Sequence, residues 1–265
     1  MARQRGVIRV KGLLGDLSFY HSGGKDLVKT PGGASKKAIL SDPQFKRTRE
    51  NMSEFGGSAM VGKAFRGGMA EVLPVFKERY LTSRMLSVFR KVCSNGPGVR
   101  GERTFEIVNN TVLLAGFNFN PNKILGALFS APFDYGVNTD RNETNLKISD
   151  FNTSNYINAP AGATHFRLVN IASILSDYEY NVTTKKYEAV NDSIEGLNAV
   201  TYSHYIPLGG MVGGVTILTS TIDGAPVMVP SAGLMGCIGI EFFQIVNTDY
   251  YLLNAENAMR IQNVF

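Results

Sequence analysis

The sequence lacks tryptophan and is poor in cysteine and histidine, with two and three copies among 265 residues. Two cysteines cannot build the disulfide framework of a small secreted domain. Cys93 lies beside basic residues and Cys237 in an apolar segment, so we expect both thiols to be unpaired, as in a reducing compartment. No histidine has a partner at metal-ligand spacing, so the sequence predicts no metal site.

Catalytic motifs are equally scarce. Ser22-Gly23-Gly24-Lys25 matches the Ser-x-x-Lys pattern of acylating hydrolases, but it falls in a glycine-rich turn instead of at a helix start. The glycine pairs at 209–214 lack the strand–turn–helix setting that binds dinucleotides. The acidic residues between 134 and 150 do not follow the spacing of a calcium loop. We therefore predict a non-enzymatic protein with no cofactor and no small-molecule substrate.

Targeting signals and long apolar runs are also missing. Residues 1–15 are basic at their start, and the apolar run of a signal peptide does not follow. The apolar segments 206–222 and 224–246 are interrupted by glycine pairs, prolines and Glu241. A bilayer span needs ~20 mostly apolar residues, so these segments read as buried strands. On these features alone, the sequence predicts a cytoplasmic protein.

The residues that the sequence does contain form a pattern that predicts an α+β protein, mainly β. A hairpin is expected to turn at residues 22–25, and Ser41-Asp42-Pro43 is a strong helix start that leads into a helix ending at Gly67-Gly68. Gly56, Gly57 and Gly62 inside this pattern indicate a break or a close helix contact. A second helix is predicted over about 69–92.

Short β-forming segments separated by Asn, Asp, Gly and Pro follow this region and predict an antiparallel β-sandwich of Greek-key or immunoglobulin-like type. The stretch 134–158 is Asn-rich and is predicted to be a long loop. The predicted strands are residues 105–108, 112–117, 166–169, 178–182, 186–190, 199–207, 215–221, 227–229 and 239–246.

Charge divides the chain unevenly. Residues 1–104 carry a net charge of +12 and residues 105–265 a net charge of −7. With the change in composition, this predicts a basic hairpin-plus-helical segment at 1–103 and a sandwich at 104–265, packed as one body. The basic segment is expected to meet an acidic surface: nucleic acid, lipid, an acidic protein, or the second half of this chain. Phe45, Phe55 and Phe65 are spaced like a core stripe, which disfavours nucleic-acid stacking.

Three stretches of the N-terminal quarter carry a family resemblance: GDLSFY at 15–20, KTPGG at 29–33 and SDPQFKRTRENMSEFG at 41–56. Residues 6–66 resemble a family of Bacteroidetes proteins that includes the Plug protein of the type 9 secretion system. The resemblance implies a protein that occupies the periplasmic opening of the outer-membrane β-barrel translocon when no substrate is in transit.

The resemblance further implies a steric function without catalytic residues and a location at the periplasmic face of the outer membrane. The translocon barrel, with other secretion accessory proteins, would be the partner. The positive residues expected to contribute to docking are Lys46, Arg47, Arg49, Lys63 and Arg66.

Two other function classes remain open. A signal-free, Gly- and Asn-rich β-sandwich also suits a structural subunit of a phage or mobile-element particle, which would assemble into tubes or shells. A cytosolic protein associated with nucleic acid through residues 1–104 would show a gel shift with a steep salt dependence.

Overall fold

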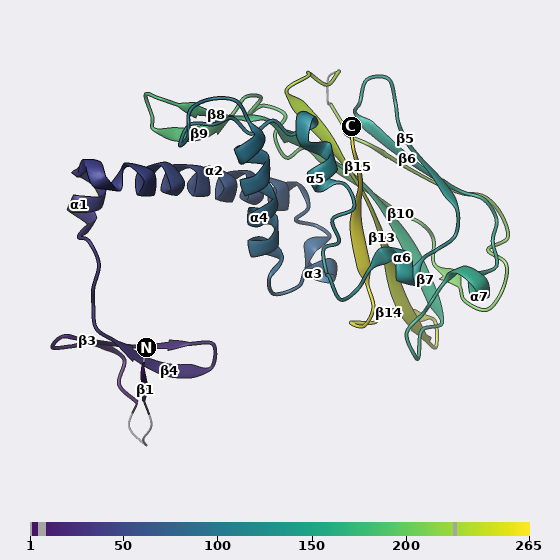
Figure 1. The fold of residues 1–265 in the computed structure, drawn as a ribbon. Helices are drawn as coiled ribbons and strands as arrows, with labels where there is room; N and C mark the ends of the chain where they lie inside the picture. The colour runs from purple at the N-terminus through teal and green to yellow at the C-terminus, as the bar shows by residue number, and fades with distance from the viewer. Residues whose placement is uncertain (1, 5–8, 225–226) are drawn as a thin grey trace. The chain divides into compact units, whose positions relative to one another are not determined.

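The structure, a computed structural model, describes residues 2–4, 9–224 and 227–265 (Figure 1). Strand outweighs helix, at 36% against 26%, and the strands pair antiparallel in several sheets. None of the sheets in the described ranges closes on itself. The prediction of a mainly β chain with antiparallel sheets is therefore confirmed.

Contacts divide the chain into two units, residues 1–49 and 50–265. This division lies well before Arg103, where the composition changes. Residues 50–103 belong to the second unit because their apolar side chains, such as Val61, Phe65 and Phe89, share one core cluster with strand residues such as Ile171. The basic composition of residues 50–103 reflects the exposed charges of their helices. Their place in the second unit reflects the buried faces of the same helices.

The first unit contains a four-stranded sheet in the order β1 (Ala2–Arg3), β4 (Lys25–Lys29), β3 (Leu17–Ser22), β2 (Gly12–Leu14). The predicted hairpin is confirmed, since Ser22 pairs with Lys25. Gly23 and Gly24 close the turn with φ of 58° and 75°, a conformation that requires glycine or a similarly permissive residue at both positions.

Helix α1 (Lys36–Ser41) and the 3₁₀ helix η1 (Pro43–Phe45) follow the sheet. The Asp42 side chain accepts a hydrogen bond from the Gln44 backbone N–H, and Pro43 occupies the first helical position. This confirms the predicted helix start, which leads into α2 (Lys46–Gly68).

Helix α2 runs without a break to Gly68, and two of its glycines, Gly57 and Gly68, allow close packing. A Cβ on Gly57 would lie 2.5 Å from Tyr187 Cδ2 and 2.8 Å from Phe105 Cε2, so only glycine lets the helix approach these two rings. The prediction of one continuous second helix at 69–92 is wrong. The segment forms α3 (Leu73–Phe76) and α4 (Leu81–Asn95), because the backbone turns extended at Lys77, with ψ of 146°.

The largest sheet contains the two longest strands, β7 (His165–Ser176) and β13 (Ala232–Val246), which pair over twelve residues. The order is β10 (Asn198–Tyr202), β7, β13, β14 (Asp249–Leu252). In addition, β11 (Ile206–Pro207) pairs with β7, and β15 (Ala258–Val264) pairs with β13.

A three-stranded sheet, β12 (Thr216–Thr221), β6 (Glu143–Ile148), β5 (Phe133–Val137), packs against one face of this large sheet. Leu146 and Leu218 share a core cluster with Phe166 and Ile240. The other face packs against α2 and α4 (Figure 1). Because both faces are covered, β7 and β13 are buried along nearly their whole lengths.

Several sequence predictions for the second unit need correction. Residues 112–117 are not a strand, because residues 108–114 form η2 (Val108–Asn110) and α5 (Thr111–Leu114). Residues 105–108 keep only an isolated bridge at Phe105, and 227–229 form no strand. The predicted loop 134–158 contains β5, β6 and α7 (Thr153–Tyr156). In β6 every second residue is buried (Thr144, Leu146 and Ile148), and the polar residues between them are half-buried or exposed.

The predicted strands 178–182 and 186–190 are confirmed as β8 (Tyr178–Asn181) and β9 (Lys186–Ala189), which pair as an antiparallel hairpin. Another short helix, α6 (Leu125–Leu128), contributes to the core cluster between the two sheets. Among the described helices, none is long and apolar enough to cross a membrane.

Candidate interaction surfaces

The described residues contain no group of three or more His, Cys, Asp or Glu side chains placed to hold a metal ion. His21 pairs with Asp26, with 2.8 Å between Nδ1 and Oδ1. His165 Nδ1 lies 3.0 Å from Thr164 Oγ1, and His204 is exposed. Both cysteines are free and buried, which confirms that they are unpaired.

The five basic residues predicted to dock all lie on α2, but they divide between the two units. Lys46 and Arg47 are exposed in the first unit. Arg49 is half-buried there, and its Nη1 donates to Ile39 O at 2.7 Å and to Asp42 O at 2.8 Å. Its guanidinium therefore holds the end of α1 in place.

The two remaining predicted docking residues belong to the second unit. Lys63 is exposed and Arg66 is half-buried. Lys63 lines a hollow between α2 and the β8–β9 region, described below. The five residues are therefore not one cluster within one unit, and Lys63 has a setting different from that of Lys46 and Arg47.

The first unit is strongly basic and has no core of its own among its described residues. Residues 1–49 carry eleven Lys and Arg against three Asp, a net charge of +8. None of the described side chains in this range is buried. Leu14 and Leu17 pair across β2 and β3, and Phe19 and Val28 across β3 and β4. These four side chains lie on one face of the sheet, which we call the N-terminal apolar face.

A groove follows α2 and the β8–β9 hairpin in the second unit. Three hollows of about 520, 400 and 250 Å³ adjoin one another. The first two share Met60 and Tyr178, and the second and third share Glu188 and Ala189. We call this surface the α2–hairpin groove; the lining residues that carry the argument are Met60, Lys63, Tyr178, Glu179, Glu188, Asp192 and Glu195.

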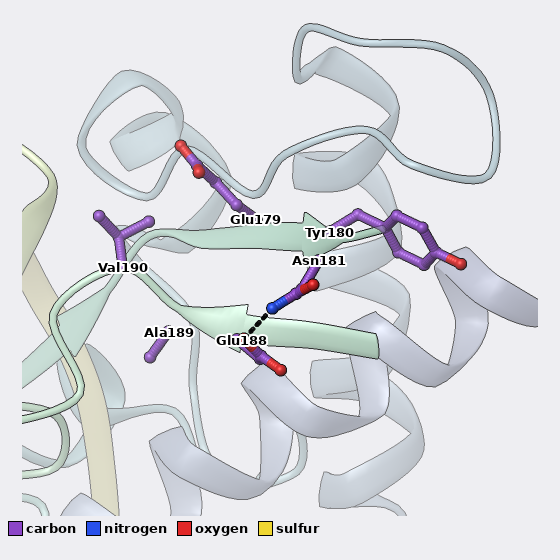
Figure 2. A pocket seen from close by; sticks show the side chains of 6 residues that line it. All are labelled: Glu179, Tyr180, Asn181, Glu188, Ala189 and Val190. Carbon is purple, nitrogen blue, oxygen red and sulfur yellow. Dashed lines mark hydrogen bonds between the residues drawn. The ribbon is translucent and has the colours of Figure 1, made fainter. Parts of the chain in front are cut away.

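Carboxylates dominate the charge of this groove. Glu179 and Glu188 are direct cross-strand partners in the hairpin, and Figure 2 shows both at its surface. Glu188 accepts hydrogen bonds from Asn181 Nδ2 at 2.8 Å and from Thr184 Oγ1 at 2.7 Å, which lower the pKa of its carboxyl. Two acidic residues directly opposite each other are an arrangement that costs stability in an isolated sheet.

Glu195 is the most deeply placed acid of the groove. Its Oε2 accepts from the Ser176 backbone N–H at 2.6 Å. Burial raises the pKa of this carboxyl to about 7, more than the Ser176 hydrogen bond lowers it. Glu195 therefore changes its charge near neutral pH.

We expect the variant Glu195→Gln to lose a pH dependence that the wild-type protein shows. Between the usual Glu pKa of 4.5 and about 7, the unfolded chain has released the proton that folded Glu195 still binds. The free energy of unfolding therefore falls as the pH rises through this window. Because Glu195 is partly exposed, the difference between the pH profiles of the two proteins amounts to about 1–3 kcal/mol.

Urea unfolding at about pH 5 and about pH 8 measures this difference. Glu179→Gln, on an exposed side chain of the same groove, is the matched control and is expected to follow the wild-type profile. Parallel profiles for wild type and Glu195→Gln would contradict the assignment.

Comparison of the chain with known proteins finds no matching family model, no matching curated protein and no matching solved structure. The function must therefore be argued from the surfaces themselves. Sequence reasoning found the hairpin and the helix that form the groove, but it missed their contact. The one sequence feature that could have indicated this contact is Gly57, because its lack of a side chain leaves room for the ring of Tyr187.

Proposed function

We propose that this chain is a non-enzymatic protein that binds and seals the periplasmic opening of the type 9 secretion translocon barrel, with its first unit as the docking element. One observation carries the proposal: a unit with a net charge of +8 has no buried side chain among its described residues. A small sheet needs a covered apolar face to be stable, so this unit requires a partner surface. The family resemblance of residues 6–66 covers most of this unit.

The partner surface is expected to be acidic at its rim and apolar at its centre. Electrostatic attraction would then supply the approach rate and the orientation, and the N-terminal apolar face would supply much of the affinity. The location would be the periplasmic face of the outer membrane. Release by an arriving substrate fits an interface of modest size, as in other transient complexes.

The second unit would provide the bulk of the plug. We propose that its two packed sheets form a β-sandwich of the Greek-key or immunoglobulin-like class expected from the sequence. The shared core of Leu146 and Leu218 with Phe166 and Ile240 supports a sandwich. Burial of β7 and β13 on both faces makes a rigid body, as a steric seal requires.

Lys46→Glu/Arg47→Glu is expected to lower recovery of the translocon barrel with the tagged full-length chain from native membranes about tenfold. Reversing two charges costs at least ~1.4 kcal/mol at an acidic rim, which corresponds to a factor of ten. Quantitative mass spectrometry of the purified complex measures the recovery. Arg49→Glu is unsuitable, because it would also release the end of α1.

Lys91→Glu, an exposed charge on α4, is the matched control and should leave recovery unchanged. Recovery of the barrel at wild-type levels with the Lys46/Arg47 variant would remove these residues from the docking surface. Failure of the wild-type chain to recover any barrel protein would overturn the proposed function.

A further inference from the structure

We infer that two copies of this chain associate, and that the N-terminal unit of one copy docks on the α2–hairpin groove of the other. The inference concerns the protein free of any other partner, and it stands independently of the proposed function. It rests on two surfaces that complement each other in charge and in apolar character.

The N-terminal apolar face is the first of these surfaces. Leu14 is 64% exposed and Leu17 is 43% exposed, while Phe19 and Val28 are half-buried. A sheet of this size is marginally stable unless one face packs against something apolar. Basic side chains of the same unit, among them Lys11 and Lys25, are exposed. The unit thus offers an apolar face together with exposed positive charge.

The α2–hairpin groove has the opposite charge. Four acidic side chains line it (Glu179, Glu188, Asp192 and Glu195, the last with a pKa of about 7), against the single ammonium group of Lys63. The direct cross-strand pairing of Glu179 with Glu188 places like charges opposite each other, a repulsion that Lys186, which lowers the pKa of Glu188, offsets only in part. A basic occupant would convert this repulsion into attraction.

The groove also presents uncovered apolar surface. Met60 is 41% exposed where it lines the first two hollows. Met52 is 54% exposed and precedes Met60 by eight residues, so the helical repeat places it on the same side of α2. Flexible methionines such as these adapt to and bind apolar partners. This strip would cover the N-terminal apolar face of the second copy.

Sedimentation velocity of the full-length chain tests the inference. The wild type is expected to shift from 28.9 kDa toward twice that mass as its concentration rises, and less so at high salt. The groove variant Glu179→Lys/Asp192→Lys and the N-terminal variant Lys11→Glu/Lys25→Glu should each associate at least tenfold more weakly. An equimolar mixture of the two variants should recover association, because each then offers the surface that the other lacks.

Loss of the apolar contact should weaken association separately. Leu14→Ser/Leu17→Ser is expected to raise the dissociation constant at least tenfold, whereas Val112→Ser, on the 88% exposed side chain of α5, should not change it. Circular dichroism of each variant checks that the fold is retained. Since all these side chains except those of Lys11 and Asp192 lie on regular elements but are exposed or near the surface, we expect the spectra to match.

Three results would overturn the inference. The wild type could remain at 28.9 kDa at every concentration. The two charge-reversed variants could stay monomeric when mixed. The wild-type chain could associate with an affinity that neither reversal changes, which would place the contact elsewhere. None of these measurements involves the translocon, so their failure is distinct from failure of the proposed function.

Discussion

Arg167→Met is expected to lower the free energy of unfolding by about 3–5 kcal/mol, because it leaves the Glu241 carboxylate buried without its partner. Glu241 on β13 is 1% exposed, and Arg167 Nε on β7 donates to its Oε2. The guanidinium also lies over the rings of Tyr202, at 4.1 Å, and Phe243, at 5.1 Å. The substitution removes both the ion pair and the cation–π contacts.

The loss should also depend on pH. Burial raises the pKa of Glu241 already in the wild type, and the Arg167 side chain opposes that effect. Without Arg167 the pKa rises further, so the folded variant binds a proton that the unfolded chain releases. Lowering the pH therefore restores part of the stability of the variant. Denaturant unfolding at several pH values measures both effects.

Two control variants separate the destabilisation caused by the buried Glu241 charge from the destabilisation caused by lost packing. In Arg167→Met/Glu241→Leu no charge is left buried, so this double variant should recover most of the lost stability. Arg100→Met breaks a long ion pair with Glu50, 3.9 Å apart, in which the Arg100 side chain is 43% exposed, and should cost less than about 1 kcal/mol. A double variant as unstable as the single one would contradict the explanation.

Gly57→Ala is expected to lower the free energy of unfolding by about 1–3 kcal/mol, although alanine is the better helix former. The new Cβ would lie less than 3.0 Å from the buried rings of Tyr187 and Phe105. These rings contact each other edge to face at 5.0 Å and pack in the core cluster between the helices and the large sheet. They cannot move without disturbing that cluster.

Its neighbour in the sequence gives a matched control. A Cβ on Gly56 meets no atom within 4 Å, and this position is exposed on the same helix. Gly56→Ala should therefore raise the free energy of unfolding by about 0.5–1 kcal/mol through helix propensity alone. Thermal or urea unfolding of the two variants in parallel tests the contrast, and an equal effect of both would show that α2 does not need the close approach.

Local rules predicted the local features of this fold. The helix start at Ser41-Asp42-Pro43 and the Gly23-Gly24 turn depend on hydrogen bonds and dihedral angles within a few residues, and both were predicted correctly. The strand at 143–148 was missed because its Glu and Asn residues resemble a loop, although every second residue is buried. Residues 112–117 were read as a strand because a short apolar run fits either a strand or a buried helix.

The surfaces could be predicted only in part. Charge counting found the basic N-terminal region, but it could not place Lys63 beside carboxylates more than a hundred residues later in the chain. Nor could it show that the Arg49 guanidinium binds the carbonyls of Ile39 and Asp42. Such contacts arise from packing of distant segments, which a single sequence does not encode in any local pattern.

The two free thiols lie in one core cluster, Cys93 on α4 and Cys237 on β13, where the helices meet the large sheet. Burial raises the pKa of Cys93 to about 11, and it raises that of Cys237 as well. Both thiols are therefore protonated and shielded at neutral pH, and an alkylating reagent can reach them only after the helices separate from the sheet. The rate at which Cys93 and Cys237 are alkylated therefore measures how often the helices separate from the large sheet, without an engineered probe.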